Sequence, residues 1–321
     1  MSPFEYSRET ELAPALTRLA QPGHVAIGGG TDLLVTIDEG LARPTAVVDV
    51  RDIGEMLGIA DAADGSLRIG GACRLDEIVA HPHVRDGFPL LASACSQVGT
   101  PAIRAMATIA GNLAQRPRCW YFRRNVSCHK TGGTTCPAHD GENQYHAILE
   151  GGPCWMVHPS DPAVALVALD AIIDIAGPEG TRSVDAGDFF VLPSERVERE
   201  TVLRDGELIV AVRLPAVARG GLQRYTKLMQ RDAWDFALVS LAAVRRTDGD
   251  VRLVLGGVSP RPYRIYTSVE EEAMSGGLDE ETIVGLAERA LLDAVPLSKN
   301  GYKVELAASL LREAIRDVAE E

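Results

Sequence analysis

Three consecutive glycines, Gly28–Gly30, lie between a short apolar segment, residues 24–27, and a helical pattern over residues 33–39. Glycine adopts positive φ without strain and lets a ligand approach the main chain closely. The N–H groups of these glycines, with those of Thr31 and Asp32 at the helix start, would form a concave surface of partial positive charge. The pattern predicts a phosphate or diphosphate site, although a tight turn without a ligand would have the same sequence.

The Rossmann dinucleotide fingerprint is the nearest alternative for this turn. Gly28 and Gly30 fit its first half, and Asp49 lies where the ribose-binding acid would be. Leu33 stands in the place of the third glycine, however, and the sequence that follows is not a repeated βαβ pattern. The turn therefore indicates a diphosphate site more strongly than a Rossmann fold.

A second glycine turn occurs at Thr108-Ile-Ala-Gly-Asn112, where we expect it to interrupt a strand-like run over residues 108–113. It combines backbone donors with the Thr108 hydroxyl and the Asn112 amide. A β-bulge or a hairpin corner would have a similar sequence. Together with the first turn, it suggests that one diphosphate is held from two sides.

The patterning divides the chain into an α+β arrangement of two domains. We expect one domain over residues 1–215, built from parts at about 1–55 and 56–215, and a smaller one over residues 216–321. Within the first domain, residues 115–157 differ in composition from the rest and show little periodicity. Helices are expected over residues 11–20, 33–39, 74–80, 89–98, 161–169, 280–294 and 303–320, and strands over residues 24–27, 45–50, 67–71, 171–176, 207–214, 237–246 and 251–257.

Charge and hydropathy exclude several classes of function. The 45 acidic residues outnumber the 32 basic ones, which gives a net charge of −13 and disfavours nucleic acid and anionic membrane surfaces as partners. The most apolar stretch, residues 161–177, contains three aspartates, which are costly in a bilayer. The first ten residues lack the basic and apolar regions of a signal peptide. We therefore expect a cytoplasmic protein, unless a partner subunit carries it to the periplasm.

Four of the six cysteines, Cys119, Cys128, Cys136 and Cys154, fall within the irregular segment. Their intervening gaps are 8, 7 and 17 residues, so the short paired spacing of structural zinc sites is absent, as is the common ferredoxin spacing. Long gaps favour a [4Fe–4S] cluster over one tetrahedral ion, because a cube has separated corners. Zinc and the absence of a metal remain alternatives. Three histidines lie in this segment and are expected at the surface or as donors to metal ligands, with replacement of a cysteine ligand as the alternative; they are His129, His139 and His146.

Several motifs along the whole chain form one pattern. They are Ala26-Ile-Gly-Gly-Gly-Thr-Asp-Leu-Leu34, Ala107-Thr-Ile-Ala-Gly-Asn-Leu113, Pro159-Ser-Asp161, Lys227-Leu-Met-Gln-Arg231 with Asp235, and Leu255-Gly-Gly-Val258. This pattern resembles the FAD-binding medium subunit of the xanthine dehydrogenase (molybdenum hydroxylase) family. The resemblance implies a two-part FAD-binding domain of the vanillyl-alcohol-oxidase (PCMH) type, followed by a small α+β C-terminal domain of the CO dehydrogenase flavoprotein type.

The cysteine segment narrows this resemblance. Arg116-Pro-Arg-Cys-Trp-Tyr-Phe-Arg123 and Tyr145-His-Ala147, with the remaining cysteines, are similar to the branch that carries an extra [4Fe–4S] cluster. Examples of that branch are the β subunit of 4-hydroxybenzoyl-CoA reductase and the flavin subunit of periplasmic aldehyde oxidoreductase. The resemblance implies that all four cysteines ligate the cluster.

The resemblance also implies which residues bind FAD. Asp161 would accept hydrogen bonds from sugar or ribityl hydroxyls, unless it is a plain helix cap. Lys227 would place positive charge near the isoalloxazine, unless it is an ordinary exposed lysine. Ala110 departs from the family, which has glycine there, so the main chain would approach the ligand less closely. The diphosphate and ribityl region would be held by Ile27, Gly28, Gly29, Gly30, Thr31, Asp32, Leu33, Leu34, Thr108, Ala110, Gly111 and Asn112.

The implied function is electron transfer by a subunit of a molybdenum-dependent oxidoreductase. FAD and the cluster would pass electrons between a partner's [2Fe–2S] centres and an external acceptor or donor. The partners would be a large molybdenum-cofactor subunit and a small [2Fe–2S] subunit, in a heterotrimer that can dimerise. No catalytic acid–base residue is expected on this chain. A stand-alone flavin dehydrogenase or oxidase and a zinc-organised interaction protein are the alternatives.

The two cofactor regions are separate in the sequence. We therefore expect replacement of Cys128 by alanine to remove iron and to leave much of the FAD bound.

Overall fold

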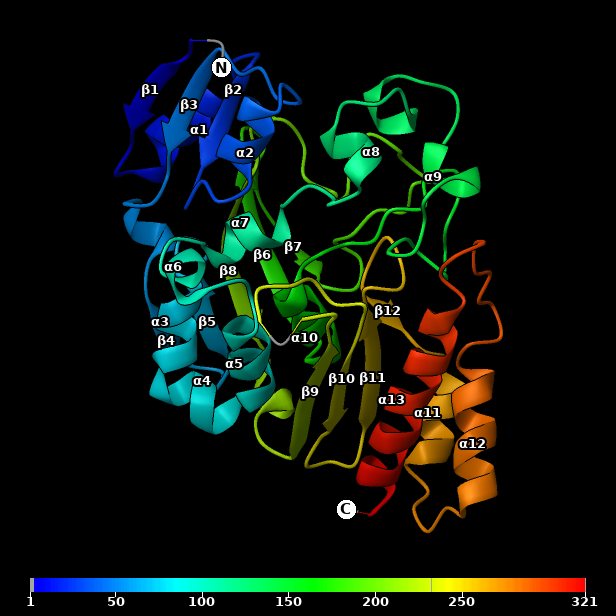
Figure 1. The fold of residues 1–321 in the computed structure, drawn as a ribbon. Coiled ribbons are helices and arrows are strands. Elements are labelled where there is room, and N and C mark those ends of the chain that lie inside the picture. The colour runs from blue at the N-terminus through cyan, green and yellow to red at the C-terminus, as the bar shows by residue number, and fades with distance from the viewer. Residues whose placement is uncertain (1–2, 232, 321) are drawn as a thin grey trace.

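The computed structural model describes residues 3–231 and 233–320. Three β-sheets follow one another along the chain, and helices cover the second and third (Figure 1). Within the described residues, no helix combines the length and the apolar character that crossing a bilayer requires. The mixed helix and strand composition confirms the α+β class expected from the sequence.

The first sheet has three parallel strands and carries the first glycine turn. The strand β3 (Ala46–Asp49) is buried throughout and lies between β1 (Glu5–Arg8) and β2 (His24–Ile27). The connections are α1 (Leu12–Leu19), after β1, and α2 (Leu33–Asp38), after β2. Because Gly28–Gly30 joins β2 to α2, this expected strand–turn–helix unit is confirmed.

The second sheet is antiparallel and has the strand order β4-β5-β8-β6-β7. We expected the strands β5 and β8 from the sequence. The edge strands β4 and β7 were not expected. Both edge strands are more exposed than the strands between them, so their apolar pattern is weak. The bounds are β4 Ile59–Asp61, β5 Leu67–Gly70, β6 Ile172–Gly177, β7 Gly180–Asp185 and β8 Leu208–Leu214.

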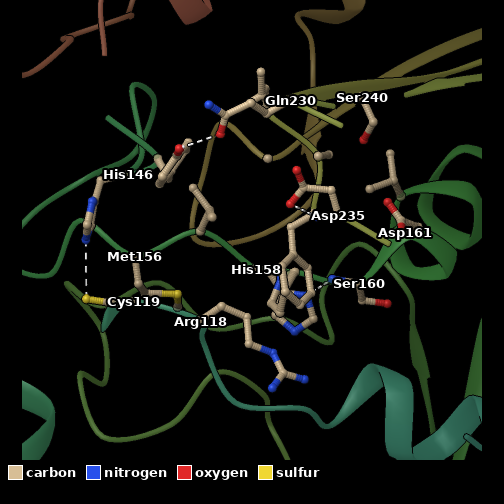
Figure 2. A pocket seen from close by; sticks show the side chains of 18 of the residues that line it. Arg118, Cys119, His146, Met156, His158, Ser160, Asp161, Gln230, Asp235 and Ser240 are labelled. Atoms are coloured by element: carbon tan, nitrogen blue, oxygen red, sulfur yellow. Dashed lines mark hydrogen bonds between the residues drawn. The ribbon is translucent and has the colours of Figure 1, made fainter. Parts of the chain in front are cut away.

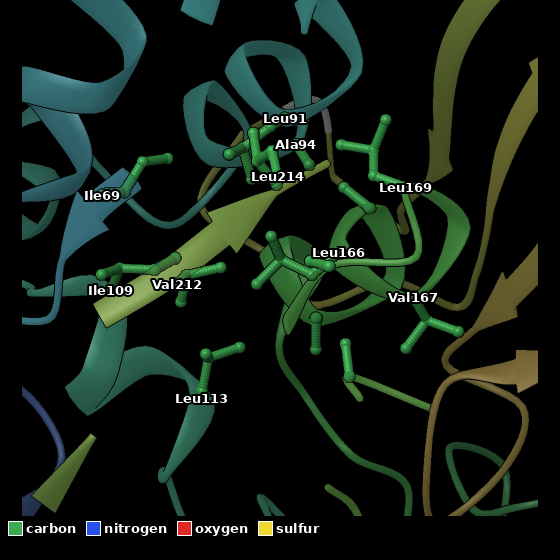
Figure 3. Close-up of a cluster of buried hydrophobic side chains, with 14 of the residues drawn as sticks. Ile69, Leu91, Ala94, Ile109, Leu113, Leu166, Val167, Leu169, Val212 and Leu214 are labelled. Atoms are coloured by element: carbon green, nitrogen blue, oxygen red, sulfur yellow. The ribbon is translucent and has the colours of Figure 1, made fainter. Parts of the chain in front are cut away.

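The helices of this region pack together in the central core (Figure 3). Every residue of α10 (Asp161–Ala168) is buried. Ser160 begins this helix, because its hydroxyl oxygen accepts a hydrogen bond from the N–H of Ala163 at 3.1 Å. Leu166 of α10 lies in one cluster with Leu91 of α5 and Val212 of β8. The remaining helices are α3 Leu75–Ala80, α4 Pro82–Gly87, α5 Pro89–Ser96, α6 Pro101–Arg104 and α7 Ile109–Leu113.

The strand-like run expected over residues 108–113 is wrong. These residues form α7, a short helix that begins after Thr108. The Thr108 hydroxyl oxygen accepts a hydrogen bond from the N–H of Gly111 at 3.2 Å, which stabilises a helix start. Apolar residues in a short run do not distinguish a buried strand from a buried helix, so the capping threonine was the informative residue.

The third sheet is antiparallel, with the order β12-β11-β10-β9, and its two faces serve two cores. Ala242 and Val244 of β10 join the central core beside α10, whereas Leu241 and Ala243 face the C-terminal helices. This alternation places the sheet between the two cores. The bounds are β9 Leu222–Leu228, β10 Val239–Arg245, β11 Val251–Gly256, β12 Tyr263–Arg264, α11 Thr267–Ala273, α12 Glu280–Arg289 and α13 Tyr302–Glu320.

The cysteine segment, residues 115–157, contains only single helical turns, as its lack of periodicity suggested. It lies beside the first sheet on one side and reaches the C-terminal helices on the other (Figure 1). Its turns are α8 Trp120–Arg123, η2 His129–Thr131 and α9 Pro137–Asp140.

Candidate functional site

The two glycine turns are in direct contact. A Cβ atom at Gly29 would lie 1.8 Å from the carbonyl oxygen of Met106, and one at Gly28 would lie 2.5 Å from the Thr108 hydroxyl oxygen. Gly30 has a φ of +71°, which favours glycine. Gly28 and Gly29 are therefore required by the pairing of the two turns, a reason that the sequence did not reveal.

A cavity of about 310 Å³ lies where these turns meet. Ile27 and Leu34 do not belong to its lining; their side chains pack over Gly30. Ala110 packs against the central core instead. The lining includes most of the residues expected to bind a diphosphate, namely Gly28, Gly29, Gly30, Thr31, Asp32, Leu33, Thr108 and Gly111.

Asp32, on the first turn, binds the cysteine segment. One carboxylate oxygen accepts from the N–H of Arg116 at 2.8 Å, and the other contacts the guanidinium groups of Arg118 at 2.8 Å and Arg123 at 2.7 Å. The segment and the turn are thus far apart in the sequence and adjacent in space. The expectation that replacement of Cys128 leaves much of the FAD bound assumed that regions separate in the sequence are separate in space, and this assumption is wrong.

A second cavity, of about 430 Å³, continues from the first, and Thr31 and Gln115 line both. Asn112, Asp161 and Lys227 line it as well. The Asn112 side-chain oxygen accepts from the hydroxyl of Ser160 at 2.5 Å, so the second glycine turn is tied to the start of α10.

Asp161 and Lys227 form a buried ion pair in the wall of this second cavity. The Lys227 ammonium lies 2.8 Å from one carboxylate oxygen, and the Tyr225 hydroxyl donates to the other at 2.7 Å. Burial raises the pKa of Asp161, and the nearby Lys227 charge opposes that shift. Ser160, not Asp161, is the helix cap, and the Lys227 side chain is only 1% exposed. Both of the simpler alternatives, a plain cap and an exposed lysine, are thus wrong.

A third cavity, of about 360 Å³, shares Arg118, Asp161 and Phe236 with the second. Figure 2 shows Arg118, His158, Met156 and Asp235 around this space. His158 is buried with its Nε2 atom unpartnered among the described residues, and burial lowers its pKa to about 3. Its ring is therefore neutral at physiological pH.

The connection between β9 and β10 lines the second and third cavities with aromatic side chains that the sequence reasoning did not identify. Trp234 is 61% exposed and Phe236 is 47% exposed. The Arg118 guanidinium lies 5.3 Å from the centre of the Phe236 ring, within the range of a cation–π contact. The position of two aromatic residues a few residues after Lys227 was the sequence signal that could have identified this side of the cavities.

The four cysteines expected to bind metal line one small apolar cavity, with Tyr121, Phe122 and Ala138 around them. None of them forms a disulfide. Within the residues that the structure describes, no group of three or more histidine, cysteine, aspartate or glutamate side chains converges as single-ion ligands do. Burial raises the pKa of Cys119, and raises that of Cys154 to about 12. The structure therefore brings the four thiols to one cavity, where burial favours the protonated form of Cys119 and Cys154.

The C-terminal domain holds the cysteine segment from its other side. The Lys303 ammonium is fully buried and donates to the carbonyl oxygens of Tyr145 at 3.0 Å and Gly257 at 2.7 Å. The Asn300 amide donates to the carbonyl oxygens of His146 and Ala147, each at 3.1 Å. Burial lowers the pKa of Lys303 to about 7.

Replacement of Lys303 by methionine should change how stability depends on pH. The ordinary lysine pKa of 10.5 applies to the unfolded chain, so between about pH 7 and 10.5 the unfolded state binds more protons. The free energy of unfolding should then rise with pH, by at most about 1.4 kcal/mol per pH unit. The variant should lose this rise. Urea unfolding at pH 7 and 9.5 measures this change in the free energy of unfolding. The control is Lys299→Met, because Lys299 belongs to an exposed ion pair with Glu142. Identical pH dependence in Lys303→Met and the parent would contradict the prediction.

Comparison with known proteins places this arrangement in a family. Residues 2–217 match the family described as the FAD binding domain in molybdopterin dehydrogenase, and residues 224–318 match the CO dehydrogenase flavoprotein C-terminal domain. The chain belongs to the family of the FAD binding domain in molybdopterin dehydrogenase. The molybdopterin dehydrogenase flavoproteins bind FAD, so the prediction of this cofactor and of a flavoprotein subunit of molybdenum-dependent oxidoreductases is confirmed.

Curated members of the molybdopterin dehydrogenase flavoprotein family align with nearly the whole chain. The aldehyde oxidoreductase FAD-binding subunit of Escherichia coli K12 is 38% identical, over 98% of this chain and 99% of that protein. The carbon monoxide dehydrogenase medium chain of Hydrogenophaga pseudoflava is 25% identical, over 97% of this chain and 96% of that one. The family resemblance drawn from the motifs is thus confirmed, and membership of the branch with an extra cluster stays a prediction.

Solved structures confirm the fold. Quinoline 2-oxidoreductase from Pseudomonas putida 86 contains a chain that superposes with a TM-score of 0.76 at 23% identity, covering 99% of this chain and 97% of that one. Carbon monoxide dehydrogenase from Hydrogenophaga pseudoflava gives a TM-score of 0.75 at 24% identity, covering 99% of this chain and 98% of that one. This chain therefore has the same fold as those two chains.

Proposed function

We propose that this chain is an electron-transfer subunit that holds FAD and a [4Fe–4S] cluster in adjacent cavities. One observation carries the proposal: Cys119, His146 and Met156 line both the thiol cavity and the third of the three connected cavities. FAD exchanges two electrons and an iron–sulfur cluster exchanges one. A shared wall between the two sites is the arrangement that such an exchange requires.

The connected cavities fit the parts of FAD. Each lies within the range of about 300–1,000 Å³ that is usual for cofactor sites, and together they run from the paired turns to the aromatic wall. The backbone at Gly28–Gly30 and Thr108–Asn112 would hold the diphosphate. Lys227 and Arg118 would place positive charge along the groove, and Phe236 would cover the ring system. Both oxygens of Asp161 have protein partners, so a bond from a ribityl hydroxyl would use a remaining lone pair.

The thiol cavity fits a cluster better than a single ion. Cys119, Cys128, Cys136 and Cys154 are distributed around an apolar wall, and four separated thiolates are what the corners of a four-iron cluster bind. A zinc ion would need all four sulfur atoms within about 2.3 Å of one point. Trp120, whose ring centre lies 5.8 Å from that of His146, would limit access of water from the third cavity.

The remaining members of the complex follow from the family. We propose a large subunit with the molybdenum cofactor, which would bind the substrate, and a small subunit with [2Fe–2S] centres. Since the relative with 38% identity is named for an aldehyde oxidoreductase, an aldehyde is the first substrate to test. The three subunits should copurify when expressed together.

Anaerobic purification of the complex tests the proposal directly. We expect about one FAD and about four iron atoms on this chain when its subunit is separated and assayed, together with a broad iron–sulfur absorbance beneath the flavin bands. Zinc in place of iron would favour the interaction-protein alternative. Full activity in a single-chain species would instead indicate a stand-alone flavin enzyme.

Replacement of Cys128 by alanine should remove iron and also lower the FAD content. Without the cluster, the three remaining thiols have no common ligand to hold the segment, and that segment supplies the Arg118 and Arg123 contacts to Asp32. Iron and FAD per chain are the measurements. Cys73→Ala, which removes a buried thiol outside the segment, should retain both. Unchanged iron in Cys128→Ala would show that the proposed ligand set is wrong.

A further inference from the structure

The wall between the thiol cavity and the third cavity is built around one side-chain contact. His146 Nε2 lies 3.3 Å from Cys119 Sγ, and Figure 2 shows the two side chains pointing toward each other. Of the four cysteines, only Cys119 lines both cavities. The contact therefore occupies the side of the thiol cavity that faces the proposed flavin site.

The chemistry of the two atoms fixes the direction of the hydrogen bond in a loaded site. A cysteine sulfur that binds iron is a thiolate, which accepts hydrogen bonds and donates none. His146 Nε2 must then carry the proton. Its other ring nitrogen, Nδ1, is buried and forms no hydrogen bond among the described residues, so it can be the unprotonated nitrogen of the neutral ring.

The surroundings hold the His146 ring in place. The ring centres of Trp120 and Tyr121 lie 5.8 and 6.2 Å from that of His146. Asn300, at the start of the C-terminal helix, donates to the backbone carbonyl of His146 at 3.1 Å. Because the aromatic neighbours and the Asn300 contact hold the His146 ring in place, the ring can donate a hydrogen bond to the sulfur without moving.

We propose that His146 is a positioning residue that raises the reduction potential of the cluster by donating a hydrogen bond from Nε2 to Cys119 Sγ. The inference rests on the function proposed above. Reduction adds negative charge to the cluster and its sulfur ligands, and an N–H donor stabilises that charge, so hydrogen bonds to sulfur raise the potential. Among the other cluster thiols, Cys128 Sγ has a more distant donor, the Thr131 hydroxyl at 3.7 Å, which is also close to two carbonyl oxygens.

The test measures the cluster potential in the intact complex by EPR-monitored redox titration. His146→Phe keeps a ring between the aromatic neighbours and removes the donor. We expect its cluster potential to fall by roughly 59 mV, which is a tenfold change in the equilibrium of a one-electron couple. His146→Gln keeps an N–H at about the position of Nε2 and should restore most of the potential. The FAD potential, titrated in the same samples by visible absorbance, should stay unchanged.

A matched control and a second variant keep the outcomes distinct. His139 lies in the same segment, is paired with Asp140 and is exposed, so His139→Gln should leave the cluster potential unchanged. If His146→Phe loses its iron, His146→Asn replaces it with the same expectation, because its shorter amide does not reach the sulfur. Iron present with an unshifted potential in these donor-free variants overturns the inference alone. A parent complex without iron on this chain overturns the proposed function and the inference together.

Discussion

Replacement of Lys227 by methionine is expected to destabilise the protein by about 3–5 kcal/mol, the effect of removing one partner of a buried ion pair. Lys227 is 1% exposed and Asp161 is 7% exposed. Without the ammonium group, the Asp161 carboxylate would remain buried with only the Tyr225 hydroxyl as a side-chain donor. Urea unfolding of the FAD-free and FAD-bound protein measures the loss.

The loss in Lys227→Met should depend on pH in a defined direction. Burial raises the pKa of Asp161 above its ordinary value of 3.8, and removal of Lys227 removes the opposing effect. A raised pKa in the folded state means that the folded state binds the extra proton, so the penalty is full above that pKa and is relieved as the pH falls. The free energy of unfolding of the variant should approach that of the parent in acid.

Two further variants test the cause of this loss. Lys227→Met with Asp161→Asn should recover much of the stability, because no buried charge remains. Arg316→Gln, at an exposed ion pair with Glu280, should cost less than about 1 kcal/mol. An effect of Lys227→Met as small as that of Arg316→Gln would contradict the buried pair.

Replacement of Gly29 by alanine should separate the paired turns and abolish FAD retention. The new Cβ would lie 1.8 Å from the Met106 carbonyl oxygen, which is backbone and cannot rotate away. We expect a loss of about 3 kcal/mol, the upper part of the usual range for overpacking. FAD content should fall by roughly tenfold or more, since tenfold in Kd requires only about 1.4 kcal/mol. Differential scanning calorimetry and FAD released per chain measure the two effects.

The control for Gly29→Ala is Gly54→Ala. A Cβ at Gly54 meets no atom within 4 Å, so stability and FAD should both be retained. If Gly29→Ala loses stability and keeps its FAD, the cofactor does not bind between the turns. If it keeps both, the contact of Gly29 with Met106 is not part of the folded protein.

The sequence predicted the elements whose residues carry a strong local pattern. The strand and helix on either side of Gly28–Gly30 are confirmed, as is the helix that begins after Ser160. The exposed edge strand β7 (Gly180–Asp185) was missed because its residues alternate without a buried apolar face. The run at residues 108–113 was assigned the wrong structure because a short run of apolar and small residues fits either type.

The glycines and cysteines that line the cavities could be singled out from the sequence, whereas the contacts between these regions could not. Asp32 was expected at the diphosphate turn, and only the fold shows that its carboxylate binds Arg116, Arg118 and Arg123. Lys227 and Asp161 were both singled out, yet their pairing joins residues 66 positions apart. Such contacts depend on how sheets and helices pack, which local patterns do not encode.

The double attachment of the cysteine segment has a consequence for how the protein must be made. Asp32 joins the segment to the beginning of the chain, and Asn300 and Lys303 join it to the end. Synthesis on the ribosome releases the segment long before the residues that complete its second attachment. Loading of the proposed cluster should therefore follow completion of the whole polypeptide, and truncated fragments that end before the last helix should mature poorly.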